Sequence, residues 1–325
     1  MTREEAFRDI NETQDYYVHQ LYDMINDSTM DIRIIIDFKS PTGTGKTKMM
    51  AKLIKLFDSE KYYFIITSLS KGQLHRQIRT NLSKDLSGRN NFFVYGSADY
   101  KINSRLDAMD IISRIPKNAK CIWLRDEGHI KTNRFDELLL SKCYKIVNFS
   151  ATPDHADIEC NFAHTMMLRT VNQCKGTPED VINKLIEIKK IHSNIKHYNP
   201  CLIVRDVNDT TVNTFIELCR SNNLKYINII NENYNIQELC KDDNEYDVII
   251  NKFKIVEGID IRRAHVLYMD NQPKNISTTI QSIGRCRRNA LLYRDDIDIL
   301  AEENADLLKA TRECYVYYNV KKHEN

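Results

Sequence analysis

The stretch SPTGTGKTKMM (Ser40–Met50) decides the fold of the first half of the chain. A β-branched run, DIRIIID, precedes it, and a segment with helical periodicity, KTKMMAKLIKLF, begins within it. Ser40 is followed by four residues and then by Gly-Lys-Thr, which is the spacing of a phosphate-binding loop with Ser in place of the usual first Gly. A Gly-rich turn between a strand and a helix can show this spacing by chance, but a strand before it and a helix after it favour the phosphate loop.

Each residue type in this loop has a chemical reason. Glycines allow backbone N–H groups to surround phosphate oxygens, Lys46 reaches the terminal phosphates, and the Thr47 hydroxyl is a ligand for Mg²⁺. The helix that follows directs its positive end at the same anion. The pattern therefore predicts a nucleoside triphosphate with Mg²⁺, and it predicts nucleotide contacts from Thr42, Gly43, Thr44, Gly45, Lys46 and Thr47.

Strand-like runs alternate with helical periods along the whole chain of 325 residues. They are RIIIDF, YYFIITS, NFFVYGS, CIWLRDE and YKIVNFS in the first half, and CLIVRD, KYINIIN, YDVIINKF, HVLYMD and CYVYYNV in the second. This alternation predicts parallel, doubly wound α/β sheets. A polar passage near Arg169–Gly176 separates the two halves, so we expect two domains, at residues 1–170 and 176–325, with a ligand cleft between them.

Composition limits the class of protein. The net charge is only +2, so nucleic-acid binding would depend on local basic patches. The nine cysteines occur singly, without a CxxC pair, which disfavours a zinc site and a disulfide framework and favours a reducing compartment. No apolar run approaches the length of a membrane span, and the first residues are charged, unlike a secretory signal. We expect a soluble, intracellular protein without a membrane partner.

Two further motifs follow strands of the first half. In CIWLRDEGH, Asp126 and Glu127 would lie at the carboxyl edge of the sheet, beside the phosphate loop. Asp126 suits Mg²⁺ coordination and Glu127 suits the general base that orients the attacking water. Arg125 is unexpected in a buried strand; either it forms an ion pair or the strand ends before it. In NFSATP, Ser150 and Thr152 follow the next strand, where hydroxyl residues are also common as turn and cap residues.

The second half contains IVEGID (residues 255–260) and QSIGRCRR (residues 281–288). If the latter is a helix, one face carries Gln281, Gly284, Arg285 and Arg288. That face would direct two guanidinium groups at one target, and Arg is suited to stabilising charge on a transferring phosphoryl group. A basic helix face that contacts solvent or nucleic-acid phosphates would have the same pattern.

Together, SPTGTGKT, TSLSKGQLHRQ, DEGH, SAT, EGID and QxxGRxxR occur in the order found in superfamily 2 helicases and translocases of the DExH type. The chain resembles most the branch with type III restriction-enzyme motor subunits and the bacterial excision-repair helicase. The resemblance covers roughly residues 14–290. It implies two tandem RecA-like parallel-sheet domains, which are phosphate-loop NTPase domains, and an ATP-dependent motor that moves along or remodels DNA or RNA.

The resemblance also implies roles for individual residues. Lys46 and Thr47 would bind the phosphates and Mg²⁺, Asp126 would bind Mg²⁺, and Glu127 would activate water. For the nucleotide, the resemblance implies that Gln14 recognises the adenine, with Gln20 as a competitor, that Gly258 and Asp260 sense the γ-phosphate, and that Gln281 contacts the nucleotide or water. Arg285 and Arg288 would be arginine fingers. Coupling between nucleotide and nucleic acid is implied for His129, Ser150 and Thr152, and nucleic-acid binding for Thr67, Ser68, Lys71 and Arg76.

Two departures leave alternatives open. The motif that usually lies between TSLSKGQ and DEGH is not readable, unless VYGSADYK serves, and we expect no strand-separating accessory domain after the last motif. A nucleotide-gated clamp or scaffold with weak ATPase activity and no unwinding is therefore the main alternative. A phosphate-loop kinase or GTPase would not explain QSIGRCRR. The partners implied are nucleic acid, contacted mainly through its phosphates, and a larger replication, repair or transcription assembly.

Overall fold

The structure is a computed structural model. It describes residues 3–27, 29, 35–68, 74–96, 112–126, 139–140, 142–162, 165, 167–205, 207–230, 234–251, 261–270, 276–289, 294 and 311–319. Residues 11–162 form one compact unit, called the first unit below, and residues 163–325 with residues 1–10 form the second unit. No helix in the described part of the chain has the length and apolar character needed to cross a membrane.

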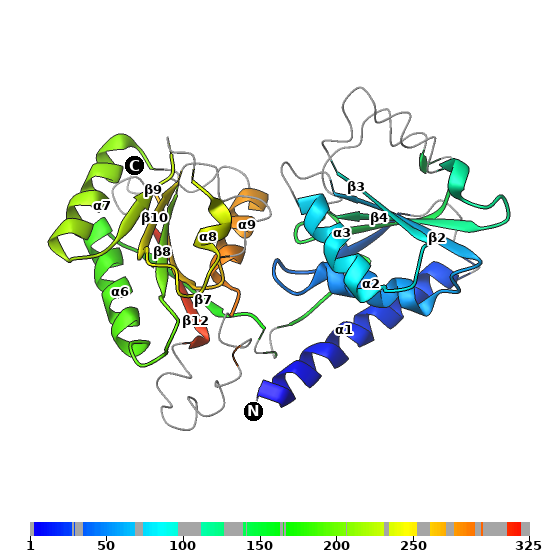
Figure 1. The fold of residues 1–325 in the computed structure, drawn as a ribbon, viewed down its shortest axis with the longest axis horizontal. Helices are drawn as coiled ribbons and strands as arrows, with labels where there is room; N and C mark the ends of the chain where they lie inside the picture. The colour runs from blue at the N-terminus through cyan, green and yellow to red at the C-terminus, as the bar shows by residue number, and fades with distance from the viewer. Residues whose placement is uncertain are drawn as a thin grey trace. The chain divides into compact units, whose positions relative to one another are not determined.

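The first unit is built on a six-stranded parallel sheet with the strand order β3-β2-β4-β5-β1-β6. Strands β2, β3 and β4 of this sheet are labelled in Figure 1. Its strands are β1 (Ile35–Lys39), β2 (Tyr62–Ser68), β3 (Phe92–Gly96), β4 (Lys120–Asp126), β5 (Cys143–Ser150) and β6 (Ile158–Glu159). Its helices are α2 (Lys46–Leu56), α3 (Leu74–Asp85) and the part of α1 (Arg3–Asn26) that begins at Asn11. The five strands that the sequence predicts in this half are confirmed, and β6 is an addition.

The apolar periodicity of α2 explains how this helix is held. Met49, Met50, Leu53 and Ile54 are fully buried, as expected for one face of an amphipathic helix. Phe57, at the carboxyl end of α2, has its ring centroid 4.7 Å from that of Tyr22 on α1 and 5.5 Å from that of Phe64 on β2. Phe57 therefore packs α2 against both α1 and the sheet.

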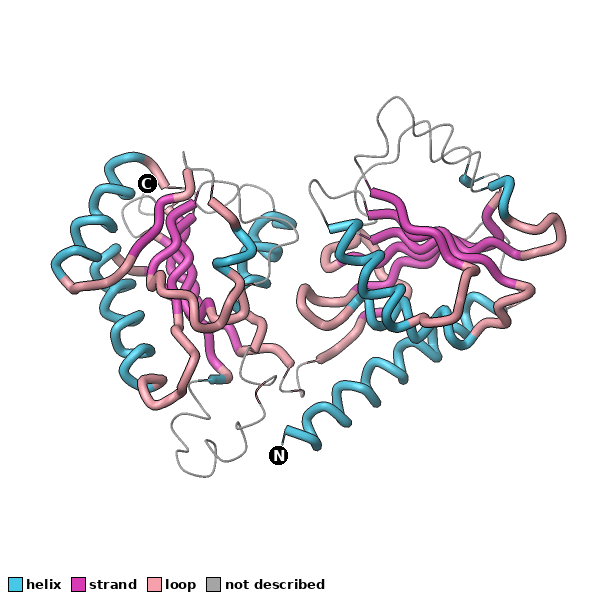
Figure 2. Tube along the Cα trace, viewed as in Figure 1, coloured by secondary structure: helices cyan, strands magenta, loops and turns pink. Residues whose placement is uncertain are grey.

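The second unit is built on another six-stranded parallel sheet, with the order β7-β12-β11-β8-β10-β9. Its strands are β7 (Thr170–Lys175), β8 (Cys201–Arg205), β9 (Tyr226–Asn228), β10 (Val248–Asn251), β11 (Ala264–Met269) and β12 (Glu313–Tyr318). Its helices are α6 (Pro178–Ile191), α7 (Asp209–Ser221), α8 (Ile236–Leu239) and α9 (Ile276–Cys286). Figure 2 shows helices on both sides of this sheet.

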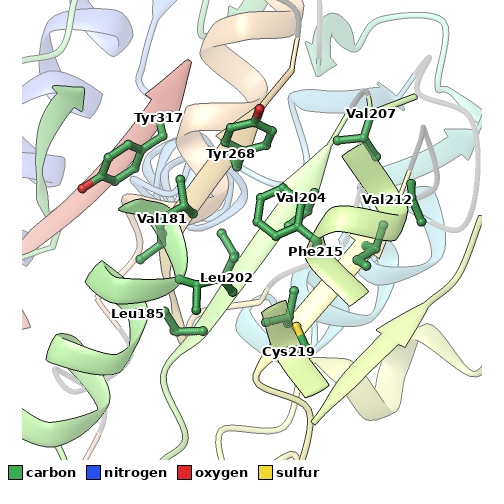
Figure 3. Packing of buried hydrophobic residues seen from close by; sticks show 14 of the residues in the cluster. Val181, Leu185, Leu202, Val204, Val207, Val212, Phe215, Cys219, Tyr268 and Tyr317 are labelled. Atoms are coloured by element: carbon green, nitrogen blue, oxygen red, sulfur yellow. The ribbon is translucent and has the colours of Figure 1, made fainter. Parts of the chain in front are cut away.

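Alternation along the central strands produces two cores in this unit. Leu202 and Val204 of β8 pack on one face with Phe215 of α7, in the cluster shown in Figure 3. Cys201 and Ile203 point to the opposite face, where they pack with Cys286 of α9. A strand buried on both faces is typical of a parallel sheet covered by helices, and the predicted parallel, doubly wound architecture is confirmed in both units.

The segment predicted as the domain boundary forms part of the second sheet. Thr170–Lys175 is strand β7, which pairs with β12 from Thr170–Glu313 to Lys175–Tyr318. The chain then turns at Gly176, where an added Cβ would lie 2.7 Å from Cδ1 of Tyr317, so only glycine fits without displacement. Thr177 caps α6 by accepting a hydrogen bond from the Asp180 N–H, and its own N–H donates to the Asp180 carboxylate.

Candidate active site

The phosphate loop joins β1 to α2 as the sequence predicts. Gly43 and Gly45 adopt left-handed φ angles of 92° and 81°, a region that residues with a Cβ enter only with strain. Gly45 is the residue that precedes the first turn of α2, and no side chain caps the helix there. The N–H groups of the first turn are therefore available to an anion, which the positive end of the helix also favours.

A chain of hydroxyl contacts orders the start of the loop. The Thr44 Oγ1 hydroxyl donates to the Pro41 carbonyl at 2.7 Å. Because its proton is used there, the Ser40 hydroxyl must donate in the 2.5 Å contact between Ser40 Oγ and Thr44 Oγ1. The Ser40 N–H also donates to the Ser150 carbonyl at 2.8 Å. Ser40, at the position of the usual first Gly, thus fixes the loop through its side chain.

Lys46 lies at the beginning of α2. Its Nζ is 3.5 Å from the Ser40 carbonyl oxygen, a distance at which a hydrogen bond is weak. The ammonium group therefore lies against the loop without being strongly held by it. That is the placement expected of a lysine that exchanges a backbone contact for a phosphate oxygen.

Cys160 borders the loop and was not singled out by the sequence. It follows β6, and its N–H donates to the Lys39 carbonyl at 2.8 Å, one residue before Ser40. Burial raises the pKa of its thiol to about 12, and this effect outweighs the nearby Ser40 hydroxyl and Lys46 charge, which lower it. The thiol is therefore neutral at physiological pH and acts as a small buried side chain against the loop. A single cysteine without a motif gives no signal for this position.

Gln14 of α1 contacts the loop directly. Its side chain is fully buried, and its Nε2 donates to the Thr44 carbonyl at 2.9 Å. A Cβ on Gly45 would lie 2.8 Å from the same Nε2. Oε1 of Gln14 is buried and has no hydrogen-bond partner among the described residues. Gln20, the competitor in the sequence, lies about 9 Å further along the helix axis.

Polar contacts fix α1 against α2 around Gln14. Lys52 Nζ lies 2.8 Å from the Asp15 carboxylate and 3.0 Å from the Asn11 carbonyl. Lys48 Nζ donates to Asn11 Oδ1 at 3.0 Å, and burial is the main cause of the lowered pKa of Lys48. Sequence reasoning missed these residues because the pairs are 37 to 41 positions apart and follow no local spacing.

The other predicted residues of the first unit lie at the carboxyl edge of its sheet. Ser68 pairs with Asp126, Asp126 with Phe149, and Lys39 with Ser150. The phosphate loop begins after Lys39, so Asp126 lies at the same edge of the sheet as the loop. Strand β4 is two strands away from β1, which is about 10 Å at the usual strand spacing. Asp126 is 6% exposed. Glu127 and His129 lie outside the described residues.

Hydroxyl side chains at this edge accept hydrogen bonds from neighbouring protein groups. The Trp123 indole donates to Thr67 Oγ1 at 3.0 Å, and the Ser150 hydroxyl accepts from the Thr152 N–H at 3.1 Å. Thr67 and Ser68 are both fully buried, so a nucleic-acid contact at these positions would use the backbone. Lys71 lies outside the described residues, and only the backbone of Arg76, on α3, is described.

Arg125 lies within β4, which continues to Asp126. The strand therefore does not end before it. Its guanidinium carbon lies 5.1 Å from the centroid of the Trp123 ring, a distance typical of a cation–π contact. Arg125 is 5% exposed.

In the second unit, α9 contains Gln281, Gly284 and Arg285, but it ends at Cys286. Arg288 lies beyond the helix, in an antiparallel bridge with Leu168, so the expected continuous face of four residues is wrong at Arg288. The prediction failed because periodicity in the sequence does not show where this helix stops. Arg285 is 7% exposed, the side chain of Gln281 is not described, and Gly258 and Asp260 lie outside the described residues.

The residues around the phosphate loop fit a nucleotide with Mg²⁺. The left-handed glycines and the uncapped start of α2 form a cradle for phosphate oxygens, and Lys46 adds a positive charge. Thr47, in the first turn of α2, and Asp126 supply one hydroxyl and one carboxylate. Such a sparse set suits Mg²⁺, which keeps several waters and takes phosphate ligands from a substrate. Within the described residues, no group of three or more His, Cys, Asp or Glu could hold a metal ion.

Residues 8–155 match the family model of the type III restriction enzyme, res subunit. No curated protein sequence matches the chain. The matched residues include α1 from Arg8 onward, the phosphate loop and the strand that ends at Asp126.

The fold is similar to two solved structures at low sequence identity. A variant of S. cerevisiae Dbp5 bound to Gle1 and IP6 superposes with a TM-score of 0.56 at 15% identity, covering 93% of this chain and 81% of that one. RecG bound to a three-way DNA junction gives a TM-score of 0.54 at 13% identity, covering 94% of this chain and 42% of that one. These likenesses show the tandem RecA-like fold.

Proposed function

We propose that this protein is a DExH-type motor that hydrolyses ATP to move along, or remodel, nucleic acid. The observation that carries the proposal is the phosphate loop, in which left-handed glycines lead into an uncapped helix at the sheet edge that also carries Asp126. The family model over residues 8–155 supports it. In this proposal residues 1–170 are the ATP-binding domain and residues 176–325 the second helicase domain.

The first domain would bind the triphosphate and prepare water for attack. Lys46 and the N–H groups from Thr42 to Thr47 hold phosphate oxygens, and Thr47 and Asp126 hold Mg²⁺. When bound, Mg²⁺ neutralises charge that develops on the phosphates. Glu127 orients the attacking water and accepts its proton. Gln14 reads the adenine edge from α1.

The second domain would complete the site. Arg285 and Arg288 stabilise negative charge on the transferring phosphoryl group, which is the effect attributed to arginine fingers. Gly258 and Asp260 sense the γ-phosphate, and Gln281 contacts the nucleotide or the attacking water. The buried position of Arg285 and the backbone bridge at Arg288 support this, because a finger must be held in place before the reaction to be effective.

Nucleic acid would be held mainly through its phosphates. The backbone at Thr67 and Ser68, and the side chains of Lys71 and Arg76, supply these contacts, so sequence preference is weak. His129, Ser150 and Thr152 couple the nucleotide to the nucleic acid. RecG, one of the similar structures, is bound to DNA, and the proposed substrate is DNA or RNA. The motor would act inside the cell, within a replication, repair or transcription assembly.

The test is phosphate release from ATP with single- and double-stranded DNA and RNA in turn. The expected result is turnover that at least one nucleic acid stimulates. Glu127→Gln, which keeps the shape and removes the base, should bind ATP normally and hydrolyse it hardly at all. Lys46→Ala is the control for contaminating ATPases, since it removes a phosphate contact and should abolish turnover.

Two outcomes would contradict the proposal. Turnover that persists in Lys46→Ala would exclude the phosphate loop as the site. A wild-type protein that binds nucleic acid only with ATP, but does not hydrolyse it, would be the nucleotide-gated clamp.

A further inference from the structure

Arg169 is an arginine in the core of the second unit to which neither the motifs nor the proposed reaction assigns a role. Its side chain is fully buried, and it is among the largest side chains buried in this way. A buried guanidinium group is costly unless its donors are satisfied. What satisfies Arg169 therefore indicates what it holds in place.

The guanidinium group joins segments that are far apart in the sequence. Its Nη1 donates to the Cys286 carbonyl at 3.0 Å and to the Ala264 carbonyl at 2.8 Å. Its Nε donates to the Thr311 carbonyl at 3.1 Å. The planar fork thus connects the end of α9, the start of β11 and the residues before β12, which a single-point cation could not do.

The contact with Cys286 is with the last residue of α9. Terminal carbonyls of a helix lack intrahelical donors and carry partial negative charge. A positive charge buried at this point stabilises the helix end in the conformation seen here. Arg285 immediately precedes that carbonyl in the chain, so its backbone is fixed from the adjacent position.

The backbone beside Arg169 holds the residues after α9. The Arg169 N–H donates to the Arg287 carbonyl at 2.6 Å, and Leu168 forms an antiparallel bridge with Arg288. Arg288 is therefore fixed by main-chain pairing, while Cys286 is fixed by the Arg169 side chain. Residues 168–169 thus hold the chain on the carboxyl side of Arg285, at Cys286, and also at Arg288.

Neutral groups complete the surroundings of Arg169. Nη2 donates to the Tyr198 hydroxyl and to His265 Nε2, both at 3.1 Å. The Tyr198 hydroxyl in turn donates to His265 Nε2 at 2.7 Å, so this nitrogen accepts and carries no proton. These bonds orient the fork without contacting α9.

We infer that Arg169 is a positioning residue, which holds the end of α9 so that Arg285 and Arg288 are preorganised to act on the nucleotide. The inference rests on the proposed function. It concerns the conformation of this turn, and Arg169 itself touches neither nucleotide nor nucleic acid.

The test compares Arg169→Lys with Arg263→Lys. Arg263 is a matched control because it is also fully buried in the second unit and also bonds to carbonyls, at Asn199 and Tyr246, but none of these belongs to α9. Both variants are assayed at a temperature where circular dichroism shows them folded. Arg169→Lys should lower kcat by about tenfold or more while KM for ATP changes by less than about threefold, and Arg263→Lys should leave kcat within about twofold.

A second readout does not depend on ATP turnover. Hydrogen exchange of the amides in residues 283–289 should become faster in Arg169→Lys without nucleotide and stay unchanged in Arg263→Lys. If the wild-type protein hydrolyses no ATP, the proposed function fails, and exchange alone then decides whether Arg169 holds this turn.

Equal kcat in the two Lys variants, or unchanged exchange in residues 283–289 of Arg169→Lys, would overturn the inference. Should Arg169→Lys not fold, Tyr198→Phe removes only a hydroxyl that orients the fork. It should lower kcat about twofold to threefold with KM unchanged, and an unaltered kcat would count against the inference.

Discussion

At the scale of single residues, Gln14 has one half of its amide engaged and the other half buried without a partner. Nε2 is engaged by the Thr44 carbonyl, whereas Oε1 meets no donor among the described residues. A buried acceptor without a donor costs about 1–3 kcal/mol. An adenine amino group would supply the missing donor, whereas the oxygen that guanine carries at the same ring position would repel it.

The first prediction concerns this side chain. Gln14→Ala should weaken ATP binding by about tenfold, which corresponds to about 1.4 kcal/mol, and it should reduce the preference for ATP over GTP. Competition binding with the two nucleotides measures both effects. Gln20→Ala is the control on the same helix and should bind as the wild type does. An unchanged ATP preference in Gln14→Ala would exclude Gln14 as the adenine reader.

The second prediction concerns two buried histidines near Arg169. Burial lowers the pKa of His192 to about 4, and burial, helped by the Arg169 charge, holds the pKa of His265 well below its usual range. The unfolded chain takes up protons on these rings below pH 6.5, and the folded chain does not. Stability that is present above pH 6.5 is therefore lost as the pH falls toward 4.

For His192 alone the loss between pH 7 and pH 5 is about 2 kcal/mol. Urea unfolding of the full chain at the two pH values measures it. His192→Phe removes this titration, so its unfolding free energy should depend less on pH than that of the wild type. Identical pH dependence in the two proteins would show that His192 is not held neutral in the folded state.

At the scale of elements, the turn from β1 into α2 depends on one glycine for two reasons. Gly45 has a left-handed φ of 81°, and an added Cβ would come within 2.8 Å of Gln14 Nε2. Gly88, which follows α3, has a similar φ of 84° but nothing within 4 Å of an added Cβ. Substitutions at these two glycines therefore separate the effect of backbone strain from the effect of close approach to Gln14.

The third prediction uses this pair. Gly45→Ala and Gly88→Ala should each lose about 1–2 kcal/mol of stability through the left-handed conformation. Only Gly45→Ala should also weaken ATP binding, by about tenfold or more, because it displaces Gln14 and the loop. Thermal unfolding and nucleotide titration distinguish the two effects. Comparable ATP binding in both variants would contradict the role of the close approach.

The sequence shows where most elements lie, because their signals are local. Each of the ten apolar runs contains a strand, and the phosphate loop follows its motif. Strand β6 has only two residues, and β7 is a polar edge strand with the sequence TVNQCK; neither shows an apolar period. The end of α9 at Cys286 depends on residues 168–169, more than 100 positions earlier in the chain, so no local pattern reveals it.

The same reasoning applies to the site. Motif spacing predicts Lys46, Thr47 and Asp126 as site residues, because the phosphate loop follows β1 and Asp126 ends β4 at the same edge of the parallel sheet. The contacts of Asn11 and Asp15 with α2, and of Cys160 with the loop, involve residues without a motif. Side-chain burial at Thr67 and Ser68 also depends on the neighbouring strand β4, which a motif does not describe.

At the scale of the whole molecule, a net charge of +2 provides no general attraction for nucleic acid. The fourth prediction is that binding depends on a few phosphate contacts. With about four contacts to a single strand, affinity should fall roughly 50-fold between 50 and 200 mM salt. Fluorescence anisotropy with oligonucleotides of equal length and different sequence measures this and should show little sequence preference. A flat salt response would indicate base recognition instead.

We propose that residues of both halves of the chain act on one ATP molecule. Arg288 is more than 200 residues from Lys46 in the sequence, and in this proposal both act on the γ-phosphate. An arginine finger acts in the transition state and is worth about 10³–10⁵ in rate. Arg285→Ala, in the same turn, should show a smaller loss of the same kind.

The most direct measurement is therefore the kcat of Arg288→Ala for ATP hydrolysis with saturating nucleic acid, together with its Kd for ATP. We expect a kcat lower by about a thousandfold or more, with a Kd for ATP close to that of the wild type. A kcat equal to that of the wild type would show that Arg288 does not act on the γ-phosphate, and QSIGRCRR would then be a basic segment that contacts solvent or nucleic acid.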